Sequence, residues 1–125
     1  MSVLKGKAYW ASITSPNTTF DSDGVWTIDV GNLDEKNKKI AETDGLNVKN
    51  KSDDRGDFVT IKRKVRRKDG NMNKAPEIVD AQKRTMMGTL IGNGSDVNVL
   101  YSKYDWEYAG KSGVSADLRA VQVTN

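Results

Sequence analysis

Lysine and arginine recur at every second position in one stretch of the chain, "DFVTIKRKVRR" at residues 57–67. In a strand, Lys62, Lys64 and Arg66 project from one face about 7 Å apart, and Phe58 begins the same row. Such a row attracts a phosphate backbone, because binding releases the counterions condensed on it. We predict that these cations contact phosphates and that an exposed Phe58 stacks on a base. The alternative is an edge strand whose charges prevent aggregation.

A second chemical feature is a cluster of aromatic residues in "YSKYDWEYAGK" at residues 101–111. Tyr101 has the parity of the valines before it and is predicted to lie in the core. Tyr104 and Trp106 have the opposite parity, so we expect them to face outward where the strand leaves the sheet, near the same opening as the basic strand. Exposed rings at such a site stack on unpaired bases, with about 1–3 kcal/mol per base. The alternative, above all for Trp106, is a ring that closes the end of the fold.

Neighbouring cations are candidates for further phosphate contacts: Lys103, Lys111, Arg119, Lys5 and Lys7. The last two share a face with Tyr9, and they either extend the basic track or serve solubility. Tyr9 and Trp10 point to opposite faces of a strand, so one of the two is expected in the core.

Composition excludes several function classes. The chain has neither Cys nor His, which removes thiol nucleophiles, disulfides, histidine bases and most zinc sites. Phosphate-loop and dinucleotide fingerprints are missing, and the acidic residues that could hold Mg²⁺ lie in no paired motif. We therefore predict a protein that is not an enzyme and needs no cofactor or metal.

Charge is distributed unevenly along the chain. The overall net charge is +3, but residues 49–84 carry twelve Lys and Arg against six Asp and Glu, which leaves −3 for the remainder. A local basic field of this kind favours a polyanionic partner. An ordinary solvated surface is the alternative.

The organisation is that of one small β-rich domain, residues 1–125. Hydrophobic alternation predicts strands at residues 4–13, 25–30, 57–67, 78–81, 96–104 and 112–123. The "KDGN" at residues 68–71 predicts a hairpin turn, after which residues 78–81 return as a short strand. In the last strand the inward-facing positions are even-numbered up to Leu118 and odd-numbered from Val121, and this change predicts a β-bulge between them. Trp26 alternates with Ile28 and Val30 and is predicted to lie in the core.

One short helix is expected between the second and third strands. Asn32 is the predicted N-cap, Glu35 its capping-box partner, and Gly45 the end. Leu33, Ile40 and Ala41 give the helix a narrow apolar stripe, so it lies on the surface. The predicted fold class is all-β with one surface helix, a five-stranded barrel of the OB type, with a sandwich as the alternative.

Four segments taken in order resemble a known family. They are "GVWTIDV" with the helix after it, "IVDAQKR", "IGNGSDVNVLYSKYDW" and "GVSADLRAVQV". The set resembles the replication single-stranded DNA-binding protein of short-tailed lytic phages, from residue 24 onward. The resemblance implies an OB fold and sequence-independent binding of single-stranded DNA, with contacts at Tyr104, Trp106, Lys62 and Lys64.

The resemblance also implies partners and a location. Family members often form homodimers, assist the phage DNA polymerase and helicase-primase, and promote annealing and recombination, which places the protein in the cytoplasm of the infected bacterial host. They end in a long acidic tail that docks partner enzymes and competes with DNA. This chain stops at "VQVTN", and we expect that such a tail has been removed. The alternative is a protein without a tail, to which the tail-dependent partners do not transfer.

Three other functions fit parts of the same pattern. An RNA-binding OB or cold-shock-like module uses the same cations and rings. A structural or assembly protein of the virion would present the basic row to an acidic protein. A metal-dependent nuclease would use acids such as Asp96 and Asp117, which we expect at outward strand positions.

Overall fold

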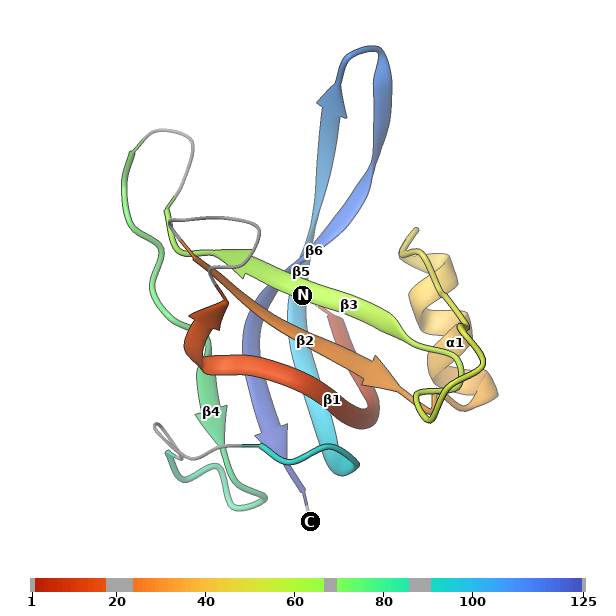
Figure 1. The fold of residues 1–125 in the computed structure, drawn as a ribbon, viewed down its shortest axis with the longest axis vertical. Helices are drawn as coiled ribbons and strands as arrows, with labels where there is room; N and C mark the ends of the chain where they lie inside the picture. The colour runs from red at the N-terminus through yellow and green to blue at the C-terminus, as the bar shows by residue number, and fades with distance from the viewer. Residues whose placement is uncertain (1, 18–23, 67–69, 86–90, 125) are drawn as a thin grey trace.

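The computed structural model describes residues 2–17, 24–66, 70–85 and 91–124, except for the side chains of residues 14–17, 106 and 108. Its elements are β1 (Ser2–Asn17), β2 (Val25–Gly31), α1 (Glu35–Thr43), β3 (Val59–Lys64), β4 (Glu77–Val79), β5 (Ser95–Tyr108) and β6 (Lys111–Val123) (Figure 1).

Five of the strands form a closed barrel. β1 pairs antiparallel with β2 and with β5, β2 pairs with β3, and β5 pairs with β6. The ring is closed by a parallel contact of β3 with β6, at Lys62 and Asp117. β4 is added outside the ring, parallel to β6. The predicted fold class, an OB-type barrel with one surface helix, is confirmed.

The side chains at the inward-facing positions of each strand fill the barrel. Leu4, Ile28, Ile61, Val99 and Leu118 are all fully buried, as the alternation of strand side chains requires. The predicted core positions of Trp26 and Tyr101 are confirmed, with exposures of 8% and 0%.

The predicted bulge in the last strand is also confirmed. Leu100 pairs with Ala120 and the next residue, Tyr101, pairs with Leu118, so Arg119 is the extra residue of β6. This insertion lets both Leu118 and Val121 face inward.

The helix begins two residues later than the predicted cap. Asp34 is the N-cap, and its Oδ1 accepts a hydrogen bond from the backbone N–H of Asn37 at 2.8 Å. Asn32 instead takes a left-handed conformation, φ 49°, and its N–H bonds to the carbonyl of Arg55. The predicted end is confirmed, because Gly45 follows the C-cap with φ 81°.

The strand that carries the aromatic segment, β5, runs four residues further than the predicted end at residue 104. β5 and β6 continue in register past the barrel as a two-stranded hairpin, out to the pair Tyr108–Lys111. Ala109 and Gly110 both have positive φ at its tip, as a tight hairpin turn requires. We call residues 102–117 the arm, which projects from one end of the barrel (Figure 1).

A second projection lies beside the arm and follows β3. Arg66 forms an isolated bridge with Met72, and the N–H of Asn73 bonds to the carbonyl of Val65 at 2.8 Å. The chain therefore reverses between these residues, and residues 67–69 of the predicted turn lie outside the described part. The returning strand exists as β4 but pairs with β6 rather than with β3.

Candidate nucleic-acid interface

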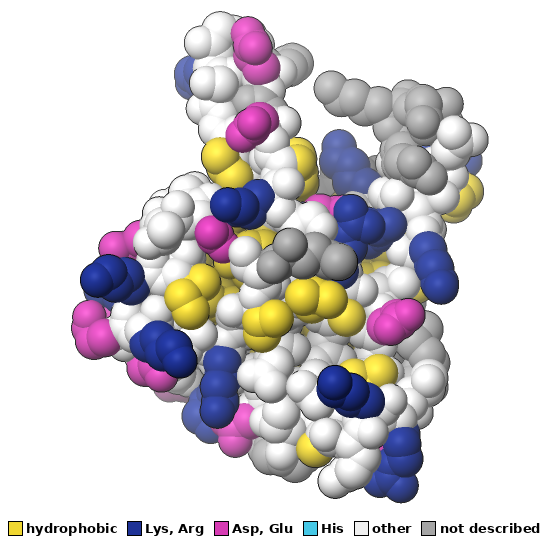
Figure 2. All heavy atoms as spheres, turned by 180° about the vertical axis from the view of Figure 1, so that it is seen from behind, with side chains coloured by type: hydrophobic (Ala, Val, Ile, Leu, Met, Phe, Trp, Pro, Cys, Tyr) yellow, Lys and Arg dark blue, Asp and Glu magenta, His cyan; other side chains and the backbone are white. Residues whose placement is uncertain are grey.

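A groove of roughly 500 Å³ lies between the end of β3, the segment after it, and the root of the arm. Its lining combines cations, amides, a hydroxyl and one aromatic ring: Arg63, Lys64, Asn73, Ser102, Lys103, Tyr104, Asp117 and Arg119. We call this the arm groove. Figure 2 shows basic side chains gathered in the gap between the two projections. The predicted convergence of β3 cations with a late aromatic residue is therefore found here for Lys64 and Tyr104.

The arm groove is electropositive. Four of its lining residues are cations, and Asp117 is the acid among them. Asp117 is bonded to Arg63 at 2.7 Å and lies 3.3 Å from Arg119. Lys64 forms no ion pair with the described part of the chain, so its ammonium group is available to an anion. Lys103 is also paired, with Asp44 outside the lining, so four positive charges face two carboxylates, and this excess suits a phosphate backbone.

Arg63 shapes the floor of the groove. It has the inward parity of β3, but it comes where the barrel ends, and its side chain is 10% exposed. Its Nη1 donates to Asp117 of β6, and its Nε donates to the carbonyl of Lys74 at 2.8 Å. These bonds tie β3 to β6 where the ring closes. The sequence marks Arg63 only as a break in the apolar pattern and gives it no role.

Tyr104 provides the aromatic wall of the groove. It pairs with Ser115 across the arm and is 46% exposed, so its predicted outward orientation is confirmed. The backbone of Trp106 pairs with Gly113, but its side chain lies outside the described part, and its role stays a prediction.

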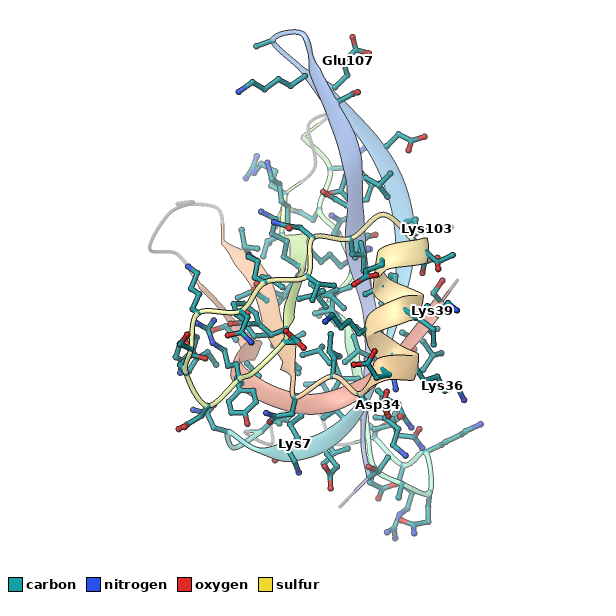
Figure 3. The ribbon with its side chains drawn as sticks, turned by 90° about the vertical axis from the view of Figure 1, so that its right-hand side faces the viewer. Lys7, Asp34, Lys36, Lys39, Lys103 and Glu107 are labelled. Carbon is teal, nitrogen blue, oxygen red and sulfur yellow. The ribbon has the colours of Figure 1, made fainter. Side chains whose placement is uncertain are left out.

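The root of the arm is anchored to the helix by a buried tyrosine. The Tyr101 hydroxyl donates to Asp44 Oδ2 at 2.6 Å. Burial, and then this bond, raises the pKa of Tyr101, while the same bond lowers the pKa of Asp44 below its ordinary value. Asp44 also lies 3.3 Å from Lys103. This contact holds Lys103 above the C-terminal end of α1 (Figure 3).

Lys62 lies in a hollow of its own on the other side of the β3–β6 contact. This hollow, roughly 230 Å³, is also lined by Lys49, Thr60 and Ser115. Lys62 is exposed and forms no ion pair within the described residues. The structure therefore divides the predicted row of cations between two adjacent depressions.

The predicted exposure of Phe58 is wrong. Phe58 is 1% exposed because the segment before β3 folds back and pairs Lys49 with Phe58. The Arg55 guanidinium covers the ring at 3.8 Å from its centroid, and the Lys49 ammonium lies at 5.5 Å. A ring covered in this way cannot stack on a base, so Phe58 is removed from the candidate site.

The expectation that Tyr9 or Trp10 lies in the core is also wrong. Tyr9 is half-buried, with its hydroxyl 2.5 Å from Asn32 Oδ1. Trp10 is 59% exposed. A bulge in β1 between Tyr9 and Ser12 changes the side-chain alternation that the expectation assumed.

The remaining candidate cations lie outside the arm groove. Lys7 is bonded to Asp96 at 2.8 Å; it lies below the N-terminal end of α1 in Figure 3, whereas Lys103 lies above the C-terminal end. Lys5 is exposed on the same strand, Lys111 is exposed at the tip of the arm, and Arg66 is exposed beyond the end of β3. Their DNA contacts stay predictions.

The described residues contain no group of three or more acidic side chains arranged to hold a metal ion. No helix among them is long and apolar enough to cross a membrane.

Fold and groove together define an OB-type barrel with a basic, aromatic-walled groove at one end. The gp2.5 single-stranded DNA-binding protein of bacteriophage T7 has this fold, with a TM-score of 0.71 and 18% identity over 100% of this chain and 92% of that chain. The single-stranded DNA-binding protein of bacteriophage Enc34, solved with ssDNA, matches with a TM-score of 0.70 and 11% identity over 97% and 85%. Neither a protein-family model nor a curated protein sequence matches the chain.

Proposed function

We propose that this protein binds single-stranded DNA without strong sequence preference, with the arm groove as the principal site. The observation that carries the proposal is the meeting of Lys64 from β3 with Tyr104 from the arm in one open groove. Cations there neutralise phosphates, and the ring stacks on a base. Both contacts are independent of sequence, since every nucleotide has a phosphate and a π-face.

The two phage proteins with this fold support the same function, because their names describe single-stranded DNA-binding proteins and one was solved with ssDNA. We extend the proposal to phage DNA replication and recombination in the cytoplasm of the infected host. Homodimerisation and docking to a phage polymerase and helicase-primase belong to it as well. No catalytic step is assigned to the protein.

The proposal is tested by titrating labelled oligo-dT with the protein and following fluorescence anisotropy. Oligo-U and a DNA duplex of equal length serve as competitors. We expect oligo-dT to bind and the duplex to compete poorly, because paired bases offer no free face to Tyr104. Stronger competition by oligo-U than by unlabelled oligo-dT would favour the RNA-binding alternative. Absence of binding to oligo-dT would refute the proposal.

A further inference from the structure

Trp10 is an exposed aromatic residue in a conformation that bulky residues seldom adopt. Its φ of 49° lies in the left-handed region, within the β1 bulge, and such a backbone persists only where its surroundings hold it. Here the N–H of Trp10 donates to Asn93 Oδ1 at 2.8 Å. The strained backbone does not bury the ring, which remains 59% exposed. An outlier of this kind at an exposed aromatic residue suggests a binding role.

The Trp10 ring is the outermost of three stacked groups and is supported on one face by the other two. The Arg55 guanidinium lies 4.1 Å from the centroid of Trp10 and 3.8 Å from that of Phe58, so it is sandwiched between the two rings. Arg55 is itself fixed by Asp29 at 2.9 Å and by Asp53 at 2.5 Å. One face of Trp10 therefore rests on a fixed support, while its other face is open to solvent.

The positive charge in this stack is fully compensated, with one carboxylate in excess. Arg55 provides one positive charge, and Asp29 and Asp53 provide two negative charges within hydrogen-bond distance. The surroundings of Trp10 therefore do not select an anion. A flat ligand that offers a π-face suits this site, and a nucleobase is such a ligand.

The stack continues directly into the proposed DNA site. Phe58, the inner ring of the stack, begins the outer row of β3 that leads through Lys62 to Lys64. The distance along the strand from Phe58 to Lys64 is about 20 Å, six residues at about 3.3 Å each. A single DNA strand on this face can place phosphates on the two lysines and a base on Trp10.

We propose that Trp10 is a second base-stacking residue of the proposed single-stranded DNA site, at the far end of the β3 face from the arm groove. The proposal rests on the proposed function. It predicts binding through stacking with little contribution from charge, in contrast to the arm groove.

The test measures oligo-dT affinity for Trp10→Ala and Trp10→Phe across a series of salt concentrations. We expect Trp10→Ala to weaken binding about 5- to 150-fold, the range for loss of one stacked base. The slope of log K against log salt should stay at the wild-type value, because no phosphate contact is lost. Trp10→Phe should restore most of the affinity. Val3→Ala, which trims another exposed apolar residue of β1 (51% exposed), is the matched control and should bind normally.

A second readout does not depend on tolerance of the alanine substitution. In a Trp106→Phe variant, the remaining tryptophans are the exposed Trp10 and the buried Trp26. We expect oligo-dT to quench the emission of this variant, and additional replacement of Trp10 by Phe to remove the quenching.

The possible failures can be told apart. Suppose that the wild type binds oligo-dT, that the Trp10 variants bind it with the same affinity, and that oligo-dT leaves the Trp10 emission unchanged. Trp10 is then not part of the site, and this inference alone is overturned. If the wild type does not bind, the proposed function fails and the inference fails with it.

Discussion

The arm groove and the Trp10 stack lie at the two ends of the β3 face and have opposite electrostatics. In the arm groove four cations surround one carboxylate. In the stack a single guanidinium is paired with two carboxylates, one more than its charge requires, and lies between two rings. Positive charge is therefore in excess in the first region, where Lys64 is available to a ligand, while charge in the second region is used to fix a ring. Under the proposed function, the arm groove binds DNA through both charge and stacking, whereas the Trp10 stack binds it through stacking alone.

Among the variants that leave Trp10 in place, the largest effect is expected from removing the outer cations of β3. For single strands log K falls with log salt with a slope of about −0.7 per phosphate contact, so Lys62→Ala with Lys64→Ala should flatten the slope by about 1.4. That corresponds to a loss of about 25-fold in affinity at 0.1 M salt. Anisotropy titrations with oligo-dT at four or more salt concentrations measure both quantities.

The matched control for this double variant is Lys36→Ala with Lys39→Ala. Both residues are exposed on α1, on the side of the molecule seen in Figure 3, and the change in net charge is the same. We expect its salt slope to stay within about 0.3 of the wild type, because the net charge alone does not set the number of phosphate contacts. Equal loss in both variants would show that the β3 lysines act only through net charge.

A smaller effect is expected at the aromatic wall of the arm groove. Tyr104→Ala should weaken oligo-dT binding about 10-fold at every salt concentration, because it removes a stacking face worth about 1–3 kcal/mol and no charge. Tyr104→Phe should bind almost as the wild type does. A changed salt slope in Tyr104→Ala would mean that the ring positions a lysine rather than a base.

The smallest effect on binding is expected from Asp44→Asn, which acts on stability. The folded-state pKa of Asp44 is lowered, so its contribution is fully present above its unfolded pKa of about 3.9 and is lost as pH falls through the folded value. We expect the variant to be less stable by about 1 kcal/mol at pH 7. Urea unfolding should show the difference from wild type shrinking below about pH 4.

Binding by the same variant sharpens the comparison of the two regions. Asp44 lies 3.3 Å from Lys103 of the arm groove, so its neutralisation leaves Lys103 more available to a phosphate. We expect oligo-dT affinity to stay level or rise slightly while stability falls. A clear loss of affinity would show that the position of Lys103, rather than its charge, is what Asp44 provides.

The fold could be predicted from the sequence because the barrel depends on local rules. Alternation of apolar residues in β2 and β3, the phase change at Arg119 and the glycine after α1 each indicate a feature that the structure contains. The helix cap was misplaced by two residues because both Asn32 and Asp34 are good caps. The choice between them depends on the loop before β3, in which the carbonyl of Arg55 accepts a hydrogen bond from the N–H of Asn32.

The candidate site could be predicted only in part, because strand parity gives a direction but not the neighbours across the barrel. Parity correctly predicted that Tyr104 faces outward and that Tyr101 faces inward. It also predicted that Phe58 is exposed, but Arg55 from the preceding loop covers the ring. The ion pair of Arg63 with Asp117 joins residues 54 positions apart, and the exposure of Trp10 depends on a bulge. Neither feature has a signal in the local pattern of residues.

The salt dependence of oligo-dT binding by the wild-type protein tests the central claim most directly. The claim is that Lys62, Lys64 and the cations of the arm root contact phosphates along one strand of DNA. With at least three such contacts, log K should fall with log salt with a slope of about −2 or steeper. A slope near zero, or no measurable binding at 50 mM salt, would contradict the account.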